Sequence, residues 1–163
     1  FYNFQSVAIA LIVFGILFIV VENYNKDRSS IAKNINQLTY KMAIIIGLFQ
    51  LIAAIFPGTS RSGATILGAL LIGVSREVAA EFTFFLAIPV MFGASLLKLI
   101  KFGVVFTGFE FIVLSVGMIV AFVVSLLTIK LLVGYIKKHN FKIFGWYRIL
   151  LGCILLIYYF TIM

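Results

Sequence analysis

A hydroxyl-rich turn with a single arginine lies between two apolar runs, and its sequence is Pro57-Gly58-Thr59-Ser60-Arg61-Ser62-Gly63-Ala64-Thr65. The proline ends a preceding helix, and the glycines permit a tight turn. A second helix then begins near Gly63 with its unpaired N–H groups directed at the turn, an arrangement that binds phosphate. The hydroxyl groups add neutral donors, and the Arg61 guanidinium adds a planar fork that matches two phosphate oxygens. These residue types predict an anion site.

The two runs that flank this turn are apolar but short. Residues 42–56 contain Gln50 as their only polar side chain, and residues 64–74 contain only Thr65. At about 1.5 Å per helical residue, neither run crosses a hydrocarbon core of about 30 Å. A single span made of both would place Arg61 near the bilayer centre, at a cost of about 2.5–3.5 kcal/mol.

We therefore predict a broken, re-entrant helix pair over about residues 39–74, with the turn buried in protein or lining a wet cavity. The residues alone leave one alternative open, which is a turn at the membrane surface whose arginine reaches the headgroups.

The composition is that of a membrane protein. Of 163 residues, 64% are hydrophobic and 11% are charged, whereas soluble domains have roughly half and a quarter. The net charge of +8 comes from lysines and arginines at the ends of apolar segments, with no basic stripe, so we expect anionic lipid headgroups rather than nucleic acid as partners. We predict an all-α polytopic membrane protein with a single transmembrane domain over residues 1–163.

The remaining segments follow from apolar runs and helix signals. We expect spans at residues 4–21, 76–100, 109–133 and 141–162, with a polar connector at 22–37. Ser75 is a predicted N-cap, and Pro89 is expected to kink the helix that follows it. Aromatic residues near both ends of the last span are typical of membrane interfaces.

Few titratable side chains are candidates for chemistry. His139, the only histidine, lies in a basic connector, which favours a solvated loop over a general base. Glu81 lies about 9 Å along its predicted helix, which suits either a hydrated interfacial carboxylate or a deeper one with a partner. Cys153 has no Cys or His nearby in sequence, so it indicates neither a disulfide nor a zinc site.

Charge counting favours the re-entrant arrangement. If residues 39–74 return to their own side, ten basic residues share one face and two share the other, with Arg61 at depth; if they span once, the split is six to six. The positive-inside bias prefers the first and places the C-terminus outside the cytoplasm. The ten are Lys26, Arg28, Lys33, Lys41, Arg76, Lys130, Lys137, Lys138, Lys142 and Arg148, and the two are Lys98 and Lys101.

The turn resembles the P-G-x-S-R-S-x-x-T signature of the undecaprenyl pyrophosphate phosphatase family, the bacitracin-resistance type of membrane lipid phosphatase. Residues 80–94 resemble the family's segment after that signature, and Tyr147-Arg148-Ile149-Leu150-Leu151-Gly152 resembles its C-terminal helix. The resemblance covers essentially the whole chain, but only the later part of the family's length.

The family's other signature, an acidic E-x-x-x-E helix followed by a Pro-x-Ser-Ser-x-x-His turn, has no counterpart here. The resemblance implies two inverted repeats, of which this chain would be the second, and places Gln50 and Ala54 where the first repeat has its carboxylates. We therefore expect phosphate binding in this chain, no metal ligands in it, and Mg²⁺ or Ca²⁺ held by the missing half.

The resemblance implies hydrolysis of undecaprenyl diphosphate to undecaprenyl phosphate and inorganic phosphate, which recycles the lipid carrier of peptidoglycan synthesis. Arg61 and Ser60 are the expected catalytic residues. The expected diphosphate-binding residues are Gly58, Thr59, Ser60, Arg61, Ser62, Thr65 and Gln50. We expect this chain alone to be inactive, and we expect a multi-pass location in the bacterial plasma membrane.

Two other readings stay open at this point. The same broken helices could carry an anion or phospholipid across the membrane as a transporter or flippase. The turn could also be purely structural, in which case Arg61 would tolerate substitution. Membrane lipid and a polyprenyl diphosphate are the expected partners, and the oligomeric state is open, with a homodimer as one option.

Overall fold

The computed structural model describes residues 4–26, 28–103 and 107–162, and this part of the chain is helical, with one isolated bridge between Ala32 and Val74 and no strand. The helices are α1 (Phe4–Tyr24), η1 (Ile35–Gln37), α2 (Tyr40–Ile55), α3 (Arg61–Leu71), α4 (Arg76–Phe102), α5 (Gly108–Lys138) and α6 (Lys142–Ile162). Among the described residues, α1, α4, α5 and α6 are long and apolar enough to cross a membrane. The predicted all-α, multi-pass class is confirmed.

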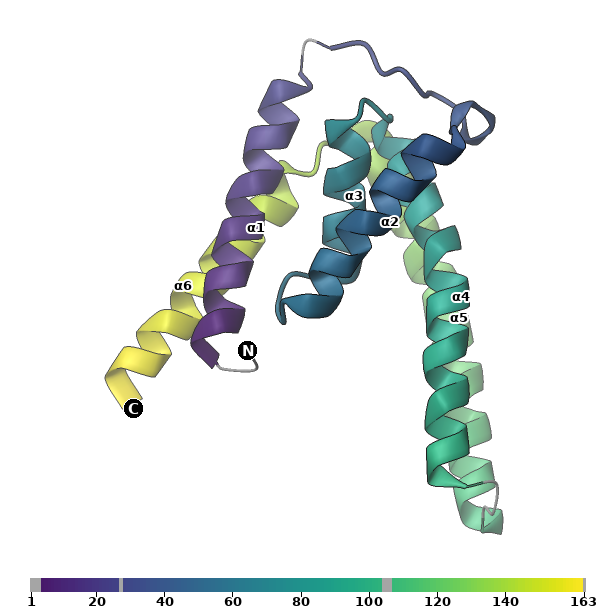
Figure 1. The fold of residues 1–163 in the computed structure, drawn as a ribbon. Coiled ribbons are helices and arrows are strands. Elements are labelled where there is room, and N and C mark those ends of the chain that lie inside the picture. Colours follow the sequence, from purple (N-terminus) through teal and green to yellow (C-terminus); the bar gives the residue numbers. More distant parts are fainter. Residues whose placement is uncertain (1–3, 27, 104–106, 163) are drawn as a thin grey trace.

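The helices α2 and α3 form a short hairpin between the α1–α6 pair and the α4–α5 pair (Figure 1). Both open ends of the hairpin lie at the end of the molecule where α1 ends and α4 begins, and its turn points toward the middle (Figure 1). With 16 and 11 residues, the two helices are about 24 Å and about 16 Å long, short of a bilayer core. This shape is what the re-entrant prediction requires; its position in a membrane stays a prediction.

Three helix boundaries differ from the predicted ones. The helix α1 continues to Tyr24, past the predicted end at Val21. The helix α3 begins at Arg61 rather than near Gly63, because the Ser60 side chain accepts a hydrogen bond from the Gly63 N–H at 3.2 Å. The helix α5 runs on to Lys138. Ser75 caps α4 as predicted, by accepting from the Val78 N–H at 3.4 Å.

Glycines let α1 and α6 pack closely along each other. A Cβ atom added at Gly15 would lie 2.8 Å from the Gly145 carbonyl oxygen, and one added at Gly145 would lie 2.7 Å from the Gly15 oxygen. Further along the pair, a Cβ at Gly152 would lie 2.9 Å from the Ala8 oxygen. Small residues at such contacts are how membrane helices approach each other.

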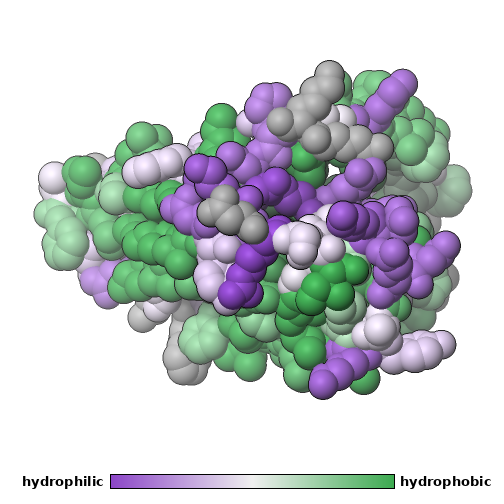
Figure 2. Space-filling model, turned by 90° about the horizontal axis from the view of Figure 1, so that it is seen from above, coloured by the Kyte–Doolittle hydropathy of each residue, from purple (hydrophilic) through white to green (hydrophobic). Residues whose placement is uncertain are grey.

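The polar connectors gather at one end of the molecule, where hydrophilic side chains cover much of the surface seen in Figure 2. The segment after α1 is hydrogen-bonded to the turn between α3 and α4, through the Ile31 N–H to the Gly73 oxygen at 2.8 Å and the Ser75 N–H to the Ala32 oxygen at 2.9 Å. The Asn25 side chain adds a bond to the Leu70 oxygen at 2.9 Å. These bonds hold the open end of the hairpin.

Glu22 is buried, with 1% of its surface exposed, at the junction of three segments. It accepts hydrogen bonds from Arg76 of α4, the shortest 2.6 Å from Nη2, and from the Phe141 N–H before α6 at 2.9 Å. The prediction that Glu22 belongs to a polar connector is wrong, because it is a buried residue of α1. Its partners are 54 and 119 residues away in sequence, so no local pattern could reveal them.

Removing Arg76 should strongly destabilise the fold, because an unpaired carboxylate would remain buried. We expect Arg76→Met to cost about 3–5 kcal/mol of stability, measured as a lower melting temperature in detergent. Glu22→Gln combined with Arg76→Met should recover most of the loss, because the amide oxygen still accepts from Phe141 and no charge is buried. Lys26→Met, at an exposed position of the same end, is the control. A melting temperature for Arg76→Met equal to the control's would contradict this role.

Candidate active site

The turn between α2 and α3 uses its backbone in conformations that most residues avoid. Gly58 has φ +87°, and Ser60 has φ +58°, the only positive φ among the described residues other than glycine. Such strain costs about 1–3 kcal/mol and persists where the surroundings over-determine it, often at functional sites. The cap on Gly63 and the 3.3 Å approach of the Ser60 and Ser62 hydroxyls hold this geometry.

Two hydroxyls of the turn serve the fold itself. Thr59 is buried and donates to the Phe56 oxygen at 2.7 Å, which satisfies a carbonyl at the end of α2. Thr65 is buried, donates to the Ser62 and Arg61 oxygens at 3.0 and 3.1 Å, and accepts from the Thr83 hydroxyl of α4 at 3.0 Å. The turn therefore offers Ser60 and Ser62, which are exposed, as its freer hydroxyls.

A cavity of about 270 Å³ adjoins the turn. Ser60, Ser62 and Arg148 contribute its polar groups on the side of the turn, and Thr83 and Tyr147 also line it. Most of its wall is apolar and comes from α1, α3, α4, α5, α6 and the residue before α6, through Phe18, Ile66, Phe84, Leu132, Phe144 and Phe141. Such a cavity suits an amphipathic ligand with an anionic group attached to an apolar chain.

Arg148 is the residue that the sequence analysis missed. Charge counting placed it with the connectors, but the structure places it on α6 against the turn, where its Nη2 donates to the Gly58 oxygen at 3.2 Å. It is half-buried and lines the cavity. Arg148 therefore leaves the set that charge counting placed with the connectors, and Arg61 is not the only arginine at the depth of the turn. The Tyr147-Arg148 pair in the predicted family segment was the signal that could have revealed it.

Two of the other predicted binding residues, Arg61 and Gln50, do not line the cavity. Arg61 is the first residue of α3 and is half-buried; within the described residues its side chain has no hydrogen bond or ion pair, and it does not line the cavity. Gln50 lies on α2, half-buried, outside the cavity lining. The catalytic roles of Arg61 and Ser60 stay predictions.

Neither of the other titratable candidates belongs to this cavity. Glu81 is exposed on α4. His139 follows the last turn of α5, where its ring stacks on Tyr135 with centroids 4.3 Å apart. Within the described ranges no three His, Cys, Asp or Glu side chains gather as metal ligands would. The described residues therefore do not build a metal cage.

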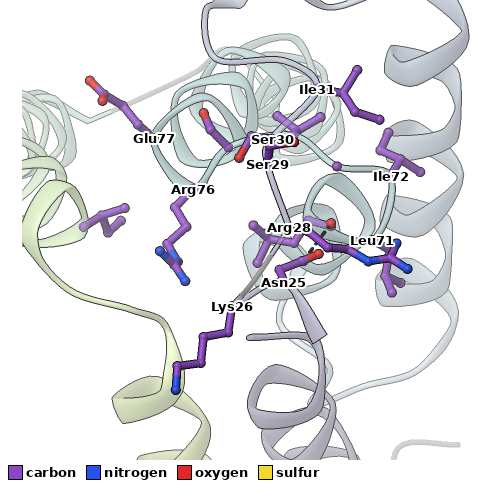
Figure 3. A pocket seen from close by; sticks show the side chains of 15 residues that line it. Asn25, Lys26, Arg28, Ser29, Ser30, Ile31, Leu71, Ile72, Arg76 and Glu77 are labelled. Carbon is purple, nitrogen blue, oxygen red and sulfur yellow. Dashed lines mark hydrogen bonds between the residues drawn. The ribbon is translucent and has the colours of Figure 1, made fainter. Parts of the chain in front are cut away.

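A second cavity, of about 700 Å³, lies among the connectors and includes Lys26, Arg28 and Arg76. In Figure 3 Arg28 points away from Lys26 and Arg76, and the Arg76 guanidinium is bound to Glu22. The Arg28 guanidinium lies 4.0 Å from the centre of the Tyr24 ring. Because these cations do not converge, we take the smaller cavity at the turn as the candidate active site.

The chain is similar in sequence to known proteins over almost its whole length. Residues 1–154 match the family described as bacitracin resistance protein BacA. The chain is 69% identical over 159 residues to the undecaprenyl-diphosphatase of Desulfitobacterium hafniense, which covers 98% of this chain and 57% of that protein. It is 66% identical over 159 residues to undecaprenyl-diphosphatase 1 of Clostridium acetobutylicum, covering 98% and 58%. A 60% identical stretch of 151 residues in the Enterococcus faecalis undecaprenyl-diphosphatase covers 93% and 54%.

The chain thus spans less than two thirds of the length of these relatives. The match nevertheless includes the whole of the turn, the helices around the cavity and the arginine on α6. The chain belongs to the bacitracin resistance protein BacA family.

Proposed function

We propose that the protein containing this chain hydrolyses undecaprenyl diphosphate to undecaprenyl phosphate and inorganic phosphate, which returns the lipid carrier to peptidoglycan synthesis. The printed names of the relatives support this proposal. The observation that carries it is the cavity at the turn, where the Ser60 and Ser62 hydroxyls and a guanidinium adjoin walls of phenylalanine and leucine. A polyprenyl diphosphate has the same division between an anionic head and an apolar chain.

In this proposal the chain binds and orients the diphosphate and stabilises negative charge. Water attacks the terminal phosphorus, the P–O bond to the bridging oxygen breaks, and the lipid monophosphate leaves with that oxygen. The Arg61 fork, the serine hydroxyls and the first N–H groups of α3 would stabilise charge on the phosphoryl oxygens as it develops. No His, Asp or Glu of the described residues lines the cavity, so none of them is placed to activate Ser60 as a nucleophile.

Mg²⁺ or Ca²⁺ is also part of the proposal, with its ligands in the portion of the relatives' length that this chain does not span. The expected partners are membrane lipid and the polyprenyl diphosphate, with no nucleic acid. The proposed location is the bacterial plasma membrane, with the C-terminus outside the cytoplasm, because without Arg148 the charge count for the re-entrant arrangement is still nine basic residues to two.

Arg61→Lys should remove most of the turnover of the complete protein, because lysine keeps the charge but loses the bidentate fork. We expect a fall in kcat of about 100-fold or more, the scale of losing one oxyanion donor. The measurement is phosphate release from a prenyl diphosphate in detergent, with Arg28→Lys on the connector face as the control. Near-normal turnover by Arg61→Lys would remove the fork from the mechanism and, with a tolerant Arg61→Ala, would favour a purely structural turn.

Two substitutions at Ser60 distinguish the role of its hydroxyl from that of its backbone conformation. Both Ser60→Ala and Ser60→Gly remove a neutral donor, so each should reduce kcat less than Arg61→Ala does. Both variants also lose the Ser60 side-chain cap on the Gly63 N–H. Only Ser60→Ala should lower the melting temperature, because glycine is a tolerated N-cap and adopts the positive φ without strain, which offsets the lost cap. If Ser60→Gly abolished phosphate release while Arg61→Ala did not, Ser60 would be the nucleophile.

Cysteine labelling tests the side on which the connectors lie. In a Cys153→Ser background, Lys33→Cys and Asn140→Cys should both be shielded from an impermeant thiol reagent in intact cells, and Lys101→Cys should be labelled. All three positions are exposed in the structure. Labelling of only one of the two connector positions would mean that the α2–α3 hairpin crosses the membrane.

A further inference from the structure

The Arg148 guanidinium packs against the backbone at both ends of the turn. Its Nη2 donates to the Gly58 oxygen at 3.2 Å. On the other side, a Cβ atom added at Gly63 would lie 2.8 Å from its Nη1, so the absence of a side chain at Gly63 admits the guanidinium to the first turn of α3. This contact explains why glycine occupies position 63, three residues after the N-cap Ser60.

The charge of Arg148 has no carboxylate opposite it. Its only ion-pair or hydrogen-bond partner among the described residues is the neutral Gly58 carbonyl. The N-terminus of α3 adds a partial positive charge beside it, and Arg61, the first residue of that helix, adds a full one. A half-buried cation in this position gains stability from a bound anion, and four of its five N–H groups remain available to donate.

The two arginines differ in their surroundings. Arg148 lines the cavity together with Phe18, Phe84 and Phe144, whereas Arg61 does not line it. In a lipid diphosphate, the phosphate bonded to the chain must lie next to the apolar wall, and the terminal phosphate lies one P–O–P linkage beyond it. The cation inside the apolar cavity is therefore matched to the inner phosphate.

We propose that Arg148 binds the phosphate that stays on the lipid, and so holds both the substrate and the lipid monophosphate product, while Arg61 serves the terminal phosphate. This inference rests on the proposed function for the identity of the lipid. The assignment makes Arg148 the residue that distinguishes a lipid-linked phosphate from free phosphate.

The test measures binding apart from turnover. The complete protein in detergent is titrated calorimetrically with farnesyl phosphate and, separately, with inorganic phosphate. Arg148→Gln should weaken farnesyl phosphate binding roughly 10- to 100-fold, the loss expected for charged hydrogen bonds, and should leave inorganic phosphate binding within about twofold. In turnover assays the same variant should raise KM for farnesyl diphosphate more than it lowers kcat. Arg28→Gln, exposed on the connector face, should change neither ligand's affinity.

Arg148→Lys covers the case in which Arg148→Gln does not fold, because lysine keeps the charge and loses only the fork; melting temperatures report folding for both. Unchanged farnesyl phosphate binding in a folded variant would overturn the proposal. Equal weakening of both ligands would also overturn it, since that result means a general effect on the turn. If the unmodified protein binds farnesyl phosphate through Arg148 but releases no phosphate from diphosphates, the proposed hydrolysis fails and the binding assignment stands.

Discussion

The buried carboxylate of Glu22 is the contact on which the arrangement of the spans depends. It joins the end of α1 to the start of α4 through Arg76, and to the start of α6 through the Phe141 N–H. Breaking such a pair inside an apolar protein leaves a charge that neither water nor another side chain compensates. Because α1, α4 and α6 all contribute to the wall of the cavity, the Glu22–Arg76 ion pair also fixes the positions of the helices that surround the turn.

Some polar groups of the turn stabilise the fold, and others are left available to a ligand. The buried threonines satisfy backbone carbonyls and link α3 to α4. Ser60 caps α3 while its hydroxyl stays exposed, next to Ser62. A sequence of hydroxyl residues therefore overstates the number of donors available to a ligand, since a buried hydroxyl without a partner would itself be costly.

Much of the fold could be predicted from the sequence, because apolar length and capping are local properties. The spans, the short hairpin at residues 39–74 and the Ser75 cap all followed from such patterns. The depth of a charged side chain is not local. Glu22 and Arg148 both lie near the polar ends of apolar segments, and only the packing of distant helices shows that one is buried against Arg76 and the other lies against the turn.

The glycine contacts between α1 and α6 have a consequence for the chemistry of the turn. Arg148 lies on α6 between Gly145 and Gly152, two positions at which an added Cβ atom would meet the α1 backbone. A slip of one residue along this seam would move the guanidinium by about 1.5 Å and turn it by about 100° around the helix. The glycine contacts between α1 and α6 thus fix the depth of the Arg148 side chain. The packing of α1 against α6, away from the turn itself, therefore sets how far into the protein Arg148 can hold a phosphate.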